Sequence, residues 1–382
     1  MNRIVRRIQR KLKIEIDRSY FHWIKNREFK NDPNFDLELV QQGFSDRKSS
    51  AQPDAKILTR IIQAYNKAKA VQESVDPCYR VGNEWVPIYE KSLKEVMGVL
   101  KSGDVEKLDR IYKGFFRDDC SAGLLGLALD MNQHFFQGAI TRRHKELFLF
   151  DALHRFKLWK SLMGNTHTVA DLAGPCIGNP YGYFIDGTFL NSGADYLHYY
   201  ATVVGRLVRG KARRVVVELG AGFGGMAYYL LRDNANLSYL DFDLPENLAL
   251  ASYYLMTAFP DKKVLLFGEA ELNAATIAEH DIILMPNFEV PKLDDGCADL
   301  VFNSYSLAEM SSEAISTYIS QFTRILKGYF MHVNHNKVAE VVADDFNIDP
   351  EQFDLLYKTP ALWNLGRNLE MDEYEYLYKK RD

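Results

Sequence analysis

The sequence predicts an α/β fold in which a helical N-terminal region precedes a mostly parallel β-sheet. Three observations support this fold class. Residues 215–217, all valine, run directly into a glycine-rich turn, which is typical of a strand that turns into a helix. Strand-like and helix-like apolar segments then alternate up to residue 334. Residues 56–136, by contrast, carry apolar side chains at three- and four-residue spacing. We therefore expect a helical cap region over 1–175 and a sheet domain over 176–382.

Individual elements follow from these patterns. In the N-terminal region we expect helices over 56–70, 86–100, 105–116 and 122–136. In the sheet domain we expect helices over 194–208, 226–232 and 274–280, and one beginning at Pro245. Strands are expected at 215–219, 237–243, 264–267, 281–285, 298–303 and 329–334, and the pair 353–357 and 374–380 is expected to form a closing antiparallel hairpin.

The glycine-rich turn indicates a bound nucleotide-like ligand. Gly220, Gly222 and Gly225 satisfy the G-x-G-x-x-G pattern of Rossmann-like folds, and Gly224 lies within it. In nicotinamide or flavin proteins this turn holds a pyrophosphate at a helix N-terminus. Glu218 would repel that dianion, whereas it suits a cationic ligand such as S-adenosylmethionine (SAM). A tight turn without any ligand is the structural alternative.

Further cofactor contacts are expected at the ends of later strands. Asp243 lies nineteen residues after Gly224, close to the spacing of the acidic residue that binds ribose hydroxyls. It could instead only cap the helix that follows. Leu244 follows it directly. Asn287 and Phe288 are candidates for the adenine contact, and Asn303 ends the next strand.

Two long segments resemble a known family. Residues 243–264 and 283–330, including Leu284-Met285-Pro286-Asn287 and Ser306-Leu307-Ala308-Glu309-Met310, resemble the bacterial sugar O-methyltransferase family, as do 108–125 and 178–181. The resemblance covers most of the chain from about residue 85. It implies a class I SAM-dependent methyltransferase sheet behind a helical region that caps the cleft. It also implies a sugar hydroxyl of a bacterial glycan or glycosylated metabolite as acceptor, and hence a place in polysaccharide biosynthesis.

Acceptor and catalytic candidates follow from position and from this resemblance. The glycine- and aromatic-rich segment 174–186, expected to be a loop, offers Asn179, Tyr181 and Tyr183 for sugar hydroxyls, although a purely structural turn is an equal alternative. Ligands of such sheets bind beyond the carboxyl ends of the strands, which selects 304–309 and 334–336. Asn334 is therefore a further acceptor contact.

The general base is expected at the same edge. His335 stands at a strand end and needs little tuning to accept a proton at neutral pH, so we place it first. Glu309 matches a glutamate of the family segment, and an equal alternative is that it caps or braces the helix that follows. Tyr305 is the third candidate. It and Ala308 stand where many members of that family carry histidine, so the segment departs from the family pattern and the catalytic role does not transfer directly. His332 is expected to pack inside its strand. No metal is assigned, since no tight carboxylate cluster is evident.

Composition limits the function classes. The 382 residues are 47% apolar and 26% charged, with a net charge of −4, which argues for a globular protein and against a nucleic-acid partner. The four cysteines form no C-x-x-C pair, which favours a reducing cytoplasm. We find no apolar run long enough to span a membrane and no secretory signal pattern.

The first residues carry a different signal. Residues 3–13 hold six positive charges, with Ile4, Ile8 and Leu12 on one helical face. Over residues 1–14 this pattern fits a basic helix at the inner face of a membrane, and equally an arm that packs on a partner chain in a homo-oligomer.

Three function classes remain open from the sequence. The first is SAM-dependent O-methylation of a sugar. The second is an NAD(P)-dependent oxidoreductase, which would need the turn to accept pyrophosphate beside Glu218. The third is a catalytically silent SAM-fold scaffold protein tethered by its basic N-terminus.

Overall fold

The computed structural model describes residues 29, 31–47, 49, 55–82, 85–125, 135–138, 140–164, 166–210, 212–337, 341–365 and 371–381. The predicted basic helix over 1–14 and the larger part of the helix expected over 122–136 lie outside these residues.

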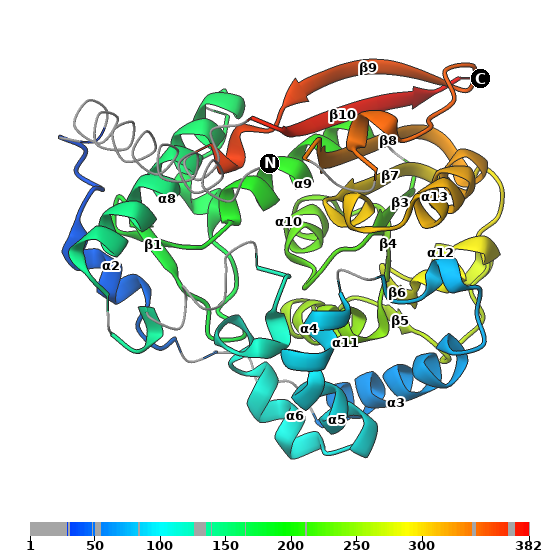
Figure 1. The fold of residues 1–382 in the computed structure, drawn as a ribbon, viewed down its shortest axis with the longest axis horizontal. Coiled ribbons are helices and arrows are strands. Elements are labelled where there is room, and N and C mark those ends of the chain that lie inside the picture. Colours follow the sequence, from blue (N-terminus) through cyan, green and yellow to red (C-terminus); the bar gives the residue numbers. More distant parts are fainter. Residues whose placement is uncertain are drawn as a thin grey trace, which may run out of the picture.

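An eight-stranded sheet forms the centre of the sheet domain, in the order β5-β6-β4-β3-β7-β8-β10-β9 (Figure 1). The strands from β5 to β8 run parallel, and β10 runs antiparallel to both β8 and β9. The predicted α/β class, with a mostly parallel sheet and a closing antiparallel hairpin, is therefore confirmed. The strands are β3 (Arg214–Leu219), β4 (Leu237–Asp243), β5 (Val264–Leu266), β6 (Ile282–Pro286), β7 (Ala298–Ser304), β8 (Leu326–His335), β9 (Phe353–Pro360) and β10 (Glu373–Lys380).

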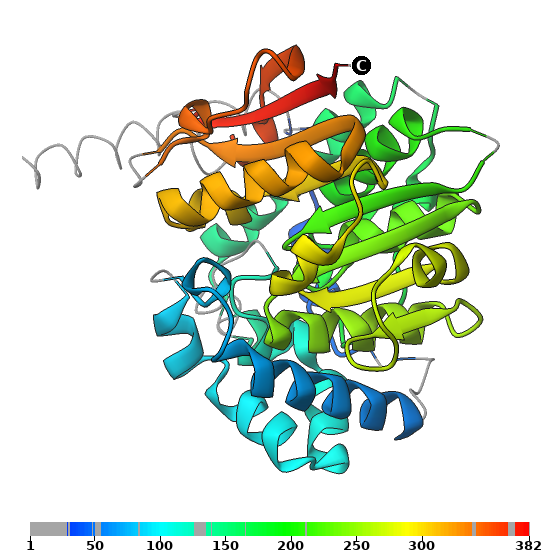
Figure 2. The same cartoon turned by 90° about the vertical axis from the view of Figure 1, so that its right-hand side faces the viewer.

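Helices cover both faces of this sheet because its strands alternate their apolar side chains between two cores. Val216 belongs to one core and the next residue, Val217, to the other. The first core also contains α9 (Ala194–Leu207), α10 (Gly225–Asp233) and α11 (Pro245–Ala258). The second core contains side chains of α12 (Ala274–Glu279) and α13 (Ser312–Ile325). Figure 2 shows the sheet between these layers.

The N-terminal region is helical, as predicted. Helices α3 (Ala55–Gln72), α4 (Val86–Lys91), α5 (Lys94–Ser102) and α6 (Val105–Tyr112) gather beside α11 at the β5 side of the sheet (Figure 2). Helices α2 (Leu37–Gly43) and α8 (Arg142–Leu162) lie apart from this group, where α2 contacts α8 and α8 contacts α9 (Figure 1). In the part of the chain that the structure describes, no helix combines the length and the apolar character that crossing a bilayer requires.

Two helix predictions in this region need correction. The single helix expected over 86–100 is divided into α4 and α5, and the break brings Leu93 into the core at 1% exposure. The helix expected over 105–116 ends at Tyr112, shortly before Gly114, because glycine is a poor helix former. A 3-10 turn over Phe115–Arg117 follows and buries Phe115 completely.

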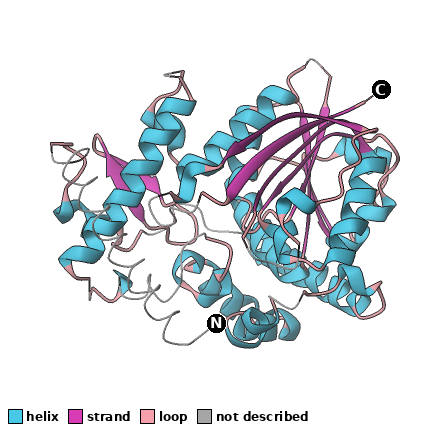
Figure 3. Ribbon diagram, turned by 45° about the horizontal axis from the view of Figure 1, so that its top comes forward, coloured by secondary structure: helices cyan, strands magenta, loops and turns pink. Residues whose placement is uncertain are grey.

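The segment expected to be a loop over 174–186 contains a strand. Strands β1 (Gly182–Ile185) and β2 (Thr188–Asn191) form a separate two-stranded antiparallel sheet, which lies apart from the main sheet in Figure 3. Gly182 makes this possible, since a Cβ there would lie 1.8 Å from the carbonyl oxygen of Leu190. A Cβ on Gly43 of α2 would meet the Gly182 oxygen at 2.0 Å, so that the helix packs directly on the hairpin backbone.

Candidate active site

A cavity of about 630 Å³ opens at the carboxyl edge of the main sheet. The ends of β3, β4 and β7 and the 3-10 turn Ser306–Glu309 form one side of its wall. Residues 77–78, 80–82, 85 and 123–124, together with parts of α8 and α9, form much of the rest. This volume is within the range of cavities that enclose small-molecule ligands.

The glycine-rich turn approaches the neighbouring wall more closely than a side chain would allow. Gly220 has φ of 79°, and a Cβ on it would lie 2.4 Å from Ser306 Oγ. Ser306 is fixed by Asn303, whose Nδ2 donates to its Oγ at 2.6 Å, and in turn it donates to the Leu219 carbonyl at 3.1 Å. The turn and the wall after β7 are therefore locked together beside the cavity.

Three buried carboxyl groups surround this turn. Glu218, Asp241 and Asp243 are exposed by 3%, 0% and 7%. The Tyr239 hydroxyl donates to Glu218 at 2.6 Å, and the Ala221 N–H donates weakly to Asp241 at 3.4 Å. Among the described residues, no lysine, arginine or histidine forms an ion pair with any of the three.

Their protonation follows from this burial. Burial raises the pKa of the Glu218 carboxyl to about 8, against the opposing effect of the Tyr239 hydrogen bond. Burial, followed by the charges of Asp243 and Glu218, raises the pKa of Asp241 well above its ordinary value. Burial also raises the pKa of Asp243 to about 6, although three hydrogen bonds oppose it. A buried carboxyl group without a cationic partner keeps its proton. A cation bound here would therefore favour the ionised form of these carboxyl groups.

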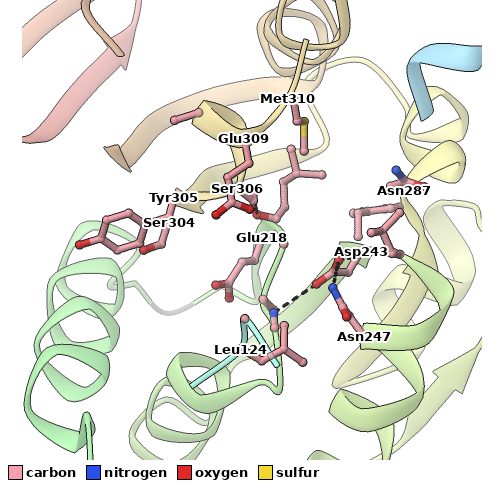
Figure 4. A pocket seen from close by; sticks show the side chains of 18 of the residues that line it. Leu124, Glu218, Asp243, Asn247, Asn287, Ser304, Tyr305, Ser306, Glu309 and Met310 are labelled. Atoms are coloured by element: carbon pink, nitrogen blue, oxygen red, sulfur yellow. Dashed lines mark hydrogen bonds between the residues drawn. The ribbon is translucent and has the colours of Figure 1, made fainter. Parts of the chain in front are cut away.

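Asp243 connects the turn with the helix that follows. Its Oδ2 accepts from the Gly222 N–H at 3.2 Å, and its Oδ1 accepts from Leu244 N at 2.7 Å and Asn247 Nδ2 at 2.9 Å. Figure 4 shows Asp243 and Asn247 side by side, with Glu218 facing the same space. The buried Asn247 Oδ1 accepts no hydrogen bond from the described part of the chain. This end of the cavity therefore holds acceptor atoms for a ligand that donates hydrogen bonds.

The N-terminal region closes over the cavity through direct contacts. The Trp85 indole donates to Glu309 Oε2 at 2.9 Å, and Asn287 Nδ2 donates to the Tyr79 carbonyl at 3.0 Å. Leu124 lies over Gly222, 3.7 Å from where a Cβ would stand. These contacts place residues of the N-terminal region against the cavity wall.

The opposite end of the cavity carries a polar network. Its side chains include residues of α8, of the turn that follows β7, and of β10. The Tyr305 hydroxyl donates to Glu373 Oε2 at 2.9 Å, and Asn364 Nδ2 donates to the same oxygen at 2.7 Å. The buried Arg155 donates to Asn364 Oδ1 at 2.7 Å and to the Trp363 carbonyl at 3.0 Å. Burial and the adjacent Glu373 charge raise the pKa of the Tyr305 hydroxyl well above 10.

Tyr305 has a strained backbone. Its φ of 66° and ψ of −32° lie in a region that residues with side chains rarely adopt. Such conformations cost ~1–3 kcal/mol and persist where the surroundings hold them. Here the Tyr305 N–H donates to the Val333 carbonyl of β8 at 2.7 Å. In Figure 4 the ring extends away from Asp243 and Asn247, toward the other end of the cavity.

Many of the residues selected from the sequence line this cavity. They are Glu218, Gly220, Gly222, Asp243, Leu244, Asn287, Tyr305 and Glu309. Most of them were predicted from their position at the ends of strands, because the carboxyl ends of parallel strands meet at one edge of the sheet. Sequence reasoning missed Arg155, Asn247, Trp363, Asn364 and Glu373, which also line it. Only Asn247 carried a usable signal, since it stands one helical turn after Asp243.

The remaining cofactor candidates lie behind the wall. Gly224 caps α10, and a Cβ there would contact Leu255. Phe288 packs edge-on against Phe267, with ring centroids 5.7 Å apart. Asn303 is fully buried, and its Nδ2 donates to the Leu219 carbonyl at 2.9 Å. It therefore helps to hold the start of the glycine-rich turn in place.

The acceptor candidates of 174–186 lie elsewhere. Tyr181 stacks on Phe44 in an aromatic core, with centroids 5.1 Å apart. The Tyr183 hydroxyl donates to the buried Asp195 at 3.0 Å. Asn179 adopts φ of 56°, and its side chain accepts from Arg47 N at 2.8 Å. These three side chains are used in packing and hydrogen bonds with other parts of the chain, which no local sequence pattern predicts, and they lie outside the cavity lining.

The two histidines and Asn334 are also outside the lining. His335 pairs in register with Glu373 at the end of β8. His332 is fully buried against the Tyr376 ring, with centroids 4.4 Å apart, and burial lowers its pKa to about 3. Asn334 donates to Asn303 Oδ1 at 2.9 Å and accepts from Ala308 N at 3.2 Å. Within the described residues, no group of three or more histidine, cysteine or acidic side chains is arranged to hold a metal ion.

Comparisons with known proteins give distant likenesses only. No family model matches the chain, and no curated protein matches it. Among solved structures, the chain is similar to a TehB-like SAM-dependent methyltransferase from Corynebacterium glutamicum (TM-score 0.34, 12% identity, 60% of this chain and 98% of that one). It is also similar to the N-methyltransferase NodS from Bradyrhizobium japonicum in complex with S-adenosyl-L-homocysteine (TM-score 0.35, 10% identity, 50% and 88%). A third is phosphoethanolamine N-methyltransferase 1 from Haemonchus contortus (TM-score 0.31, 15% identity, 64% and 51%). At these scores we base no assignment on the likenesses.

Proposed function

We propose that this protein is a SAM-dependent methyltransferase that methylates a hydroxyl group of a sugar. One observation carries the proposal: the buried carboxyl groups of Glu218, Asp241 and Asp243 surround a glycine-rich turn without a cationic partner among the described residues. A pyrophosphate placed there would find no positive charge and would disfavour ionisation of these groups further, whereas a ligand with sulfonium and ammonium groups would supply the missing positive charge and stabilise the carboxylates.

The cavity offers matching groups for each part of this cofactor. Asp243 and the unoccupied acceptor atom of Asn247 suit two ribose hydroxyls. Glu218 and the turn at Gly220 suit the charged methionine part, and Asn287 with Leu244 forms the wall proposed for adenine. When bound, SAM supplies a methyl group on a sulfonium, whose departure leaves a neutral thioether.

The acceptor is proposed from the opposite end of the cavity. Tyr305, Asn364 and Glu373 present donors and acceptors there, and the rings of Tyr196 and Trp363 supply apolar faces. Such a mixture suits the hydroxyls and the apolar ring face of a carbohydrate. The resemblance of residues 243–264 and 283–330 to sugar O-methyltransferases supports the same class. Glu309, which lines the cavity, is proposed to bind an acceptor hydroxyl.

Two measurements test this function. Isothermal titration with SAM and, separately, NAD should give binding of SAM only. Incubation with methyl-tritiated SAM and a panel of uncharged p-nitrophenyl hexopyranosides, with the matching amino sugars, phenols and simple amines, should label the glycosides. Binding of NAD in preference to SAM would contradict the cofactor assignment. Labelling confined to amines or phenols would contradict the sugar, and SAM binding without any labelling would indicate the silent scaffold.

A further inference from the structure

A chain of hydrogen bonds leads from the cavity to the protein surface. Tyr305 lines the cavity and donates its hydroxyl proton to Glu373 Oε2 at 2.9 Å. The other oxygen of Glu373 accepts from Lys337 Nζ at 3.2 Å. Glu373 is buried, with its side chain 8% exposed, whereas the Lys337 side chain is 40% exposed. The three side chains therefore connect an enclosed wall with solvent.

The surroundings fix this chain in one geometry. Asn364 donates to the oxygen of Glu373 that Tyr305 also uses, and Arg155 holds Asn364 from behind. The backbone of Tyr305 is strained, and its hydroxyl reaches this network through Glu373. Strain that is held by several contacts at a cavity wall is a common feature of functional side chains.

Glu309 is less suited to pass a proton outward. Its Oε2 accepts from the Trp85 indole at 2.9 Å, and Figure 4 shows its side chain on the Glu218 side of the wall. A group that takes a proton in an enclosed site must return it to solvent before the next turnover. Glu373 offers such a route, because the Lys337 ammonium at its other oxygen stabilises the carboxylate that remains when the proton leaves to water.

We propose that Tyr305 receives the proton of the acceptor hydroxyl and passes its own proton to Glu373. This inference rests on the proposed function. As the new carbon–oxygen bond forms, the acceptor O–H bond breaks and the electron pair of the lost carbon–sulfur bond stays on sulfur. The acceptor proton moves to Tyr305 Oη while the Tyr305 proton moves to Glu373 Oε2. Tyr305 ends as it began, and Glu373 releases one proton to water beside Lys337.

The test compares Tyr305→Phe and Glu373→Gln with a matched control on the same strand. The control is Glu375, which is also a buried carboxyl group. It accepts hydrogen bonds from the hydroxyls of Tyr357 at 2.7 Å and Tyr199 at 3.3 Å, but it lies outside the cavity lining. With a glycoside that the labelling panel identifies, each cavity variant should lose about 10²-fold or more in kcat. The affinity for SAM, measured by titration, should stay within about twofold. Glu375→Gln should keep wild-type turnover per folded molecule.

A second readout does not depend on turnover. 3-Fluorotyrosine placed at position 305 should give a ¹⁹F resonance that shifts on Glu373→Gln and stays unchanged on Glu375→Gln. Glu373→Asp should recover part of the kcat that Glu373→Gln loses, because it restores a group that can take a proton. Wild-type kcat in Tyr305→Phe, with SAM still bound, would overturn the relay alone. Failure of the wild-type protein to bind SAM would instead overturn the proposed function.

Discussion

At the scale of single residues, Asp243 has two tasks in the structure. Its carboxyl group lines the cavity. It also accepts hydrogen bonds from the Gly222 N–H and from the Asn247 side chain. Removing the whole side chain would therefore loosen the glycine-rich turn as well as the proposed ribose contact. An isosteric change separates these effects better than truncation does.

We predict that Asp243→Asn weakens SAM binding tenfold or more while the protein stays folded. Charge-assisted hydrogen bonds contribute about 1.5–3 kcal/mol each, and the amide removes the charge without removing the volume. Titration calorimetry measures the affinity, and circular dichroism checks the fold. Asp281→Asn is the control, since Asp281 pairs with Arg213 at the opposite end of the strands, outside the cavity lining. Equal SAM affinity in the wild-type and Asp243→Asn proteins would contradict the cofactor geometry.

Part of the site could be predicted from the sequence because its residues follow local patterns. Glu218 and Asp243 end strands whose apolar patterns are local, so their position at one sheet edge follows from the chain alone. Glu373 begins an antiparallel strand, and Arg155 comes from α8, more than 200 residues away from its partner Trp363. Such residues reach the cavity only through tertiary packing. The same packing explains why Tyr181 and Tyr183, which are equally polar in the sequence, lie in the core.

At the scale of elements, the strand predictions agree with the structure more closely than the helix predictions. β4 has the predicted bounds, because the apolar and aromatic side chains within 237–242 mark it as a strand and the following Leu244-Pro245 marks its end. In the N-terminal region the periodicity identified helices but missed the break at Leu93. A break without proline or glycine has no local marker, since it depends on what the side chain finds to pack against.

The attachment of α3 and α4 to α11 depends on one buried side chain. The Glu246 side chain is 1% exposed and forms an ion pair with Lys69 at 2.9 Å. It also accepts hydrogen bonds from the hydroxyls of Tyr65 and Tyr89. We predict that Glu246→Gln lowers the free energy of unfolding by about 1.5–3 kcal/mol, the range for hydrogen bonds to a charged group. Urea denaturation measures this loss, and hydrogen exchange should show faster exchange in α3 and α4.

A surface pair in the same region provides the control. Arg60 of α3 pairs with Glu269 at 2.7 Å, but the two side chains are 38% and 29% exposed. Solvent screens this pair, so Glu269→Gln should cost at most about 1 kcal/mol. Equal losses in Glu246→Gln and Glu269→Gln would show that Glu246 has no special part in holding the N-terminal helices.

At the scale of the whole molecule, the cavity should reduce stability as the pH rises. A buried carboxyl group whose pKa is raised holds a proton that the unfolded chain has already lost, so stability present at low pH disappears as the pH passes through the folded pKa. For Glu218 this window runs from the ordinary value of 4.5 to about 8. Buried histidines such as His332, with a pKa of about 3, act in the opposite direction below about pH 6.5.

We therefore predict that the ligand-free protein loses about 1–2 kcal/mol of unfolding free energy through Glu218 between about pH 6.5 and 8, at ~1.4 kcal/mol per pH unit. Denaturant unfolding at several pH values measures the slope. Glu218→Gln should flatten it, and saturating SAM should also reduce it, because the cation favours the ionised carboxylate. The same slope in the wild-type and Glu218→Gln proteins would exclude Glu218 as its cause.

The contacts that close the cavity join distant parts of the chain. The Trp85–Glu309 hydrogen bond spans 224 residues, and that between Arg155 and the Trp363 carbonyl spans 208. During synthesis on the ribosome, the N-terminal helices emerge well before the strands and turns that complete their contacts. Non-local contacts of this kind form slowly, because the entropy of closing a long loop must be overcome first. The cavity is therefore one of the last parts of the nascent chain to assemble, and ending the chain before Trp363 would deprive Arg155 of the Trp363 carbonyl and the Asn364 side chain to which it donates.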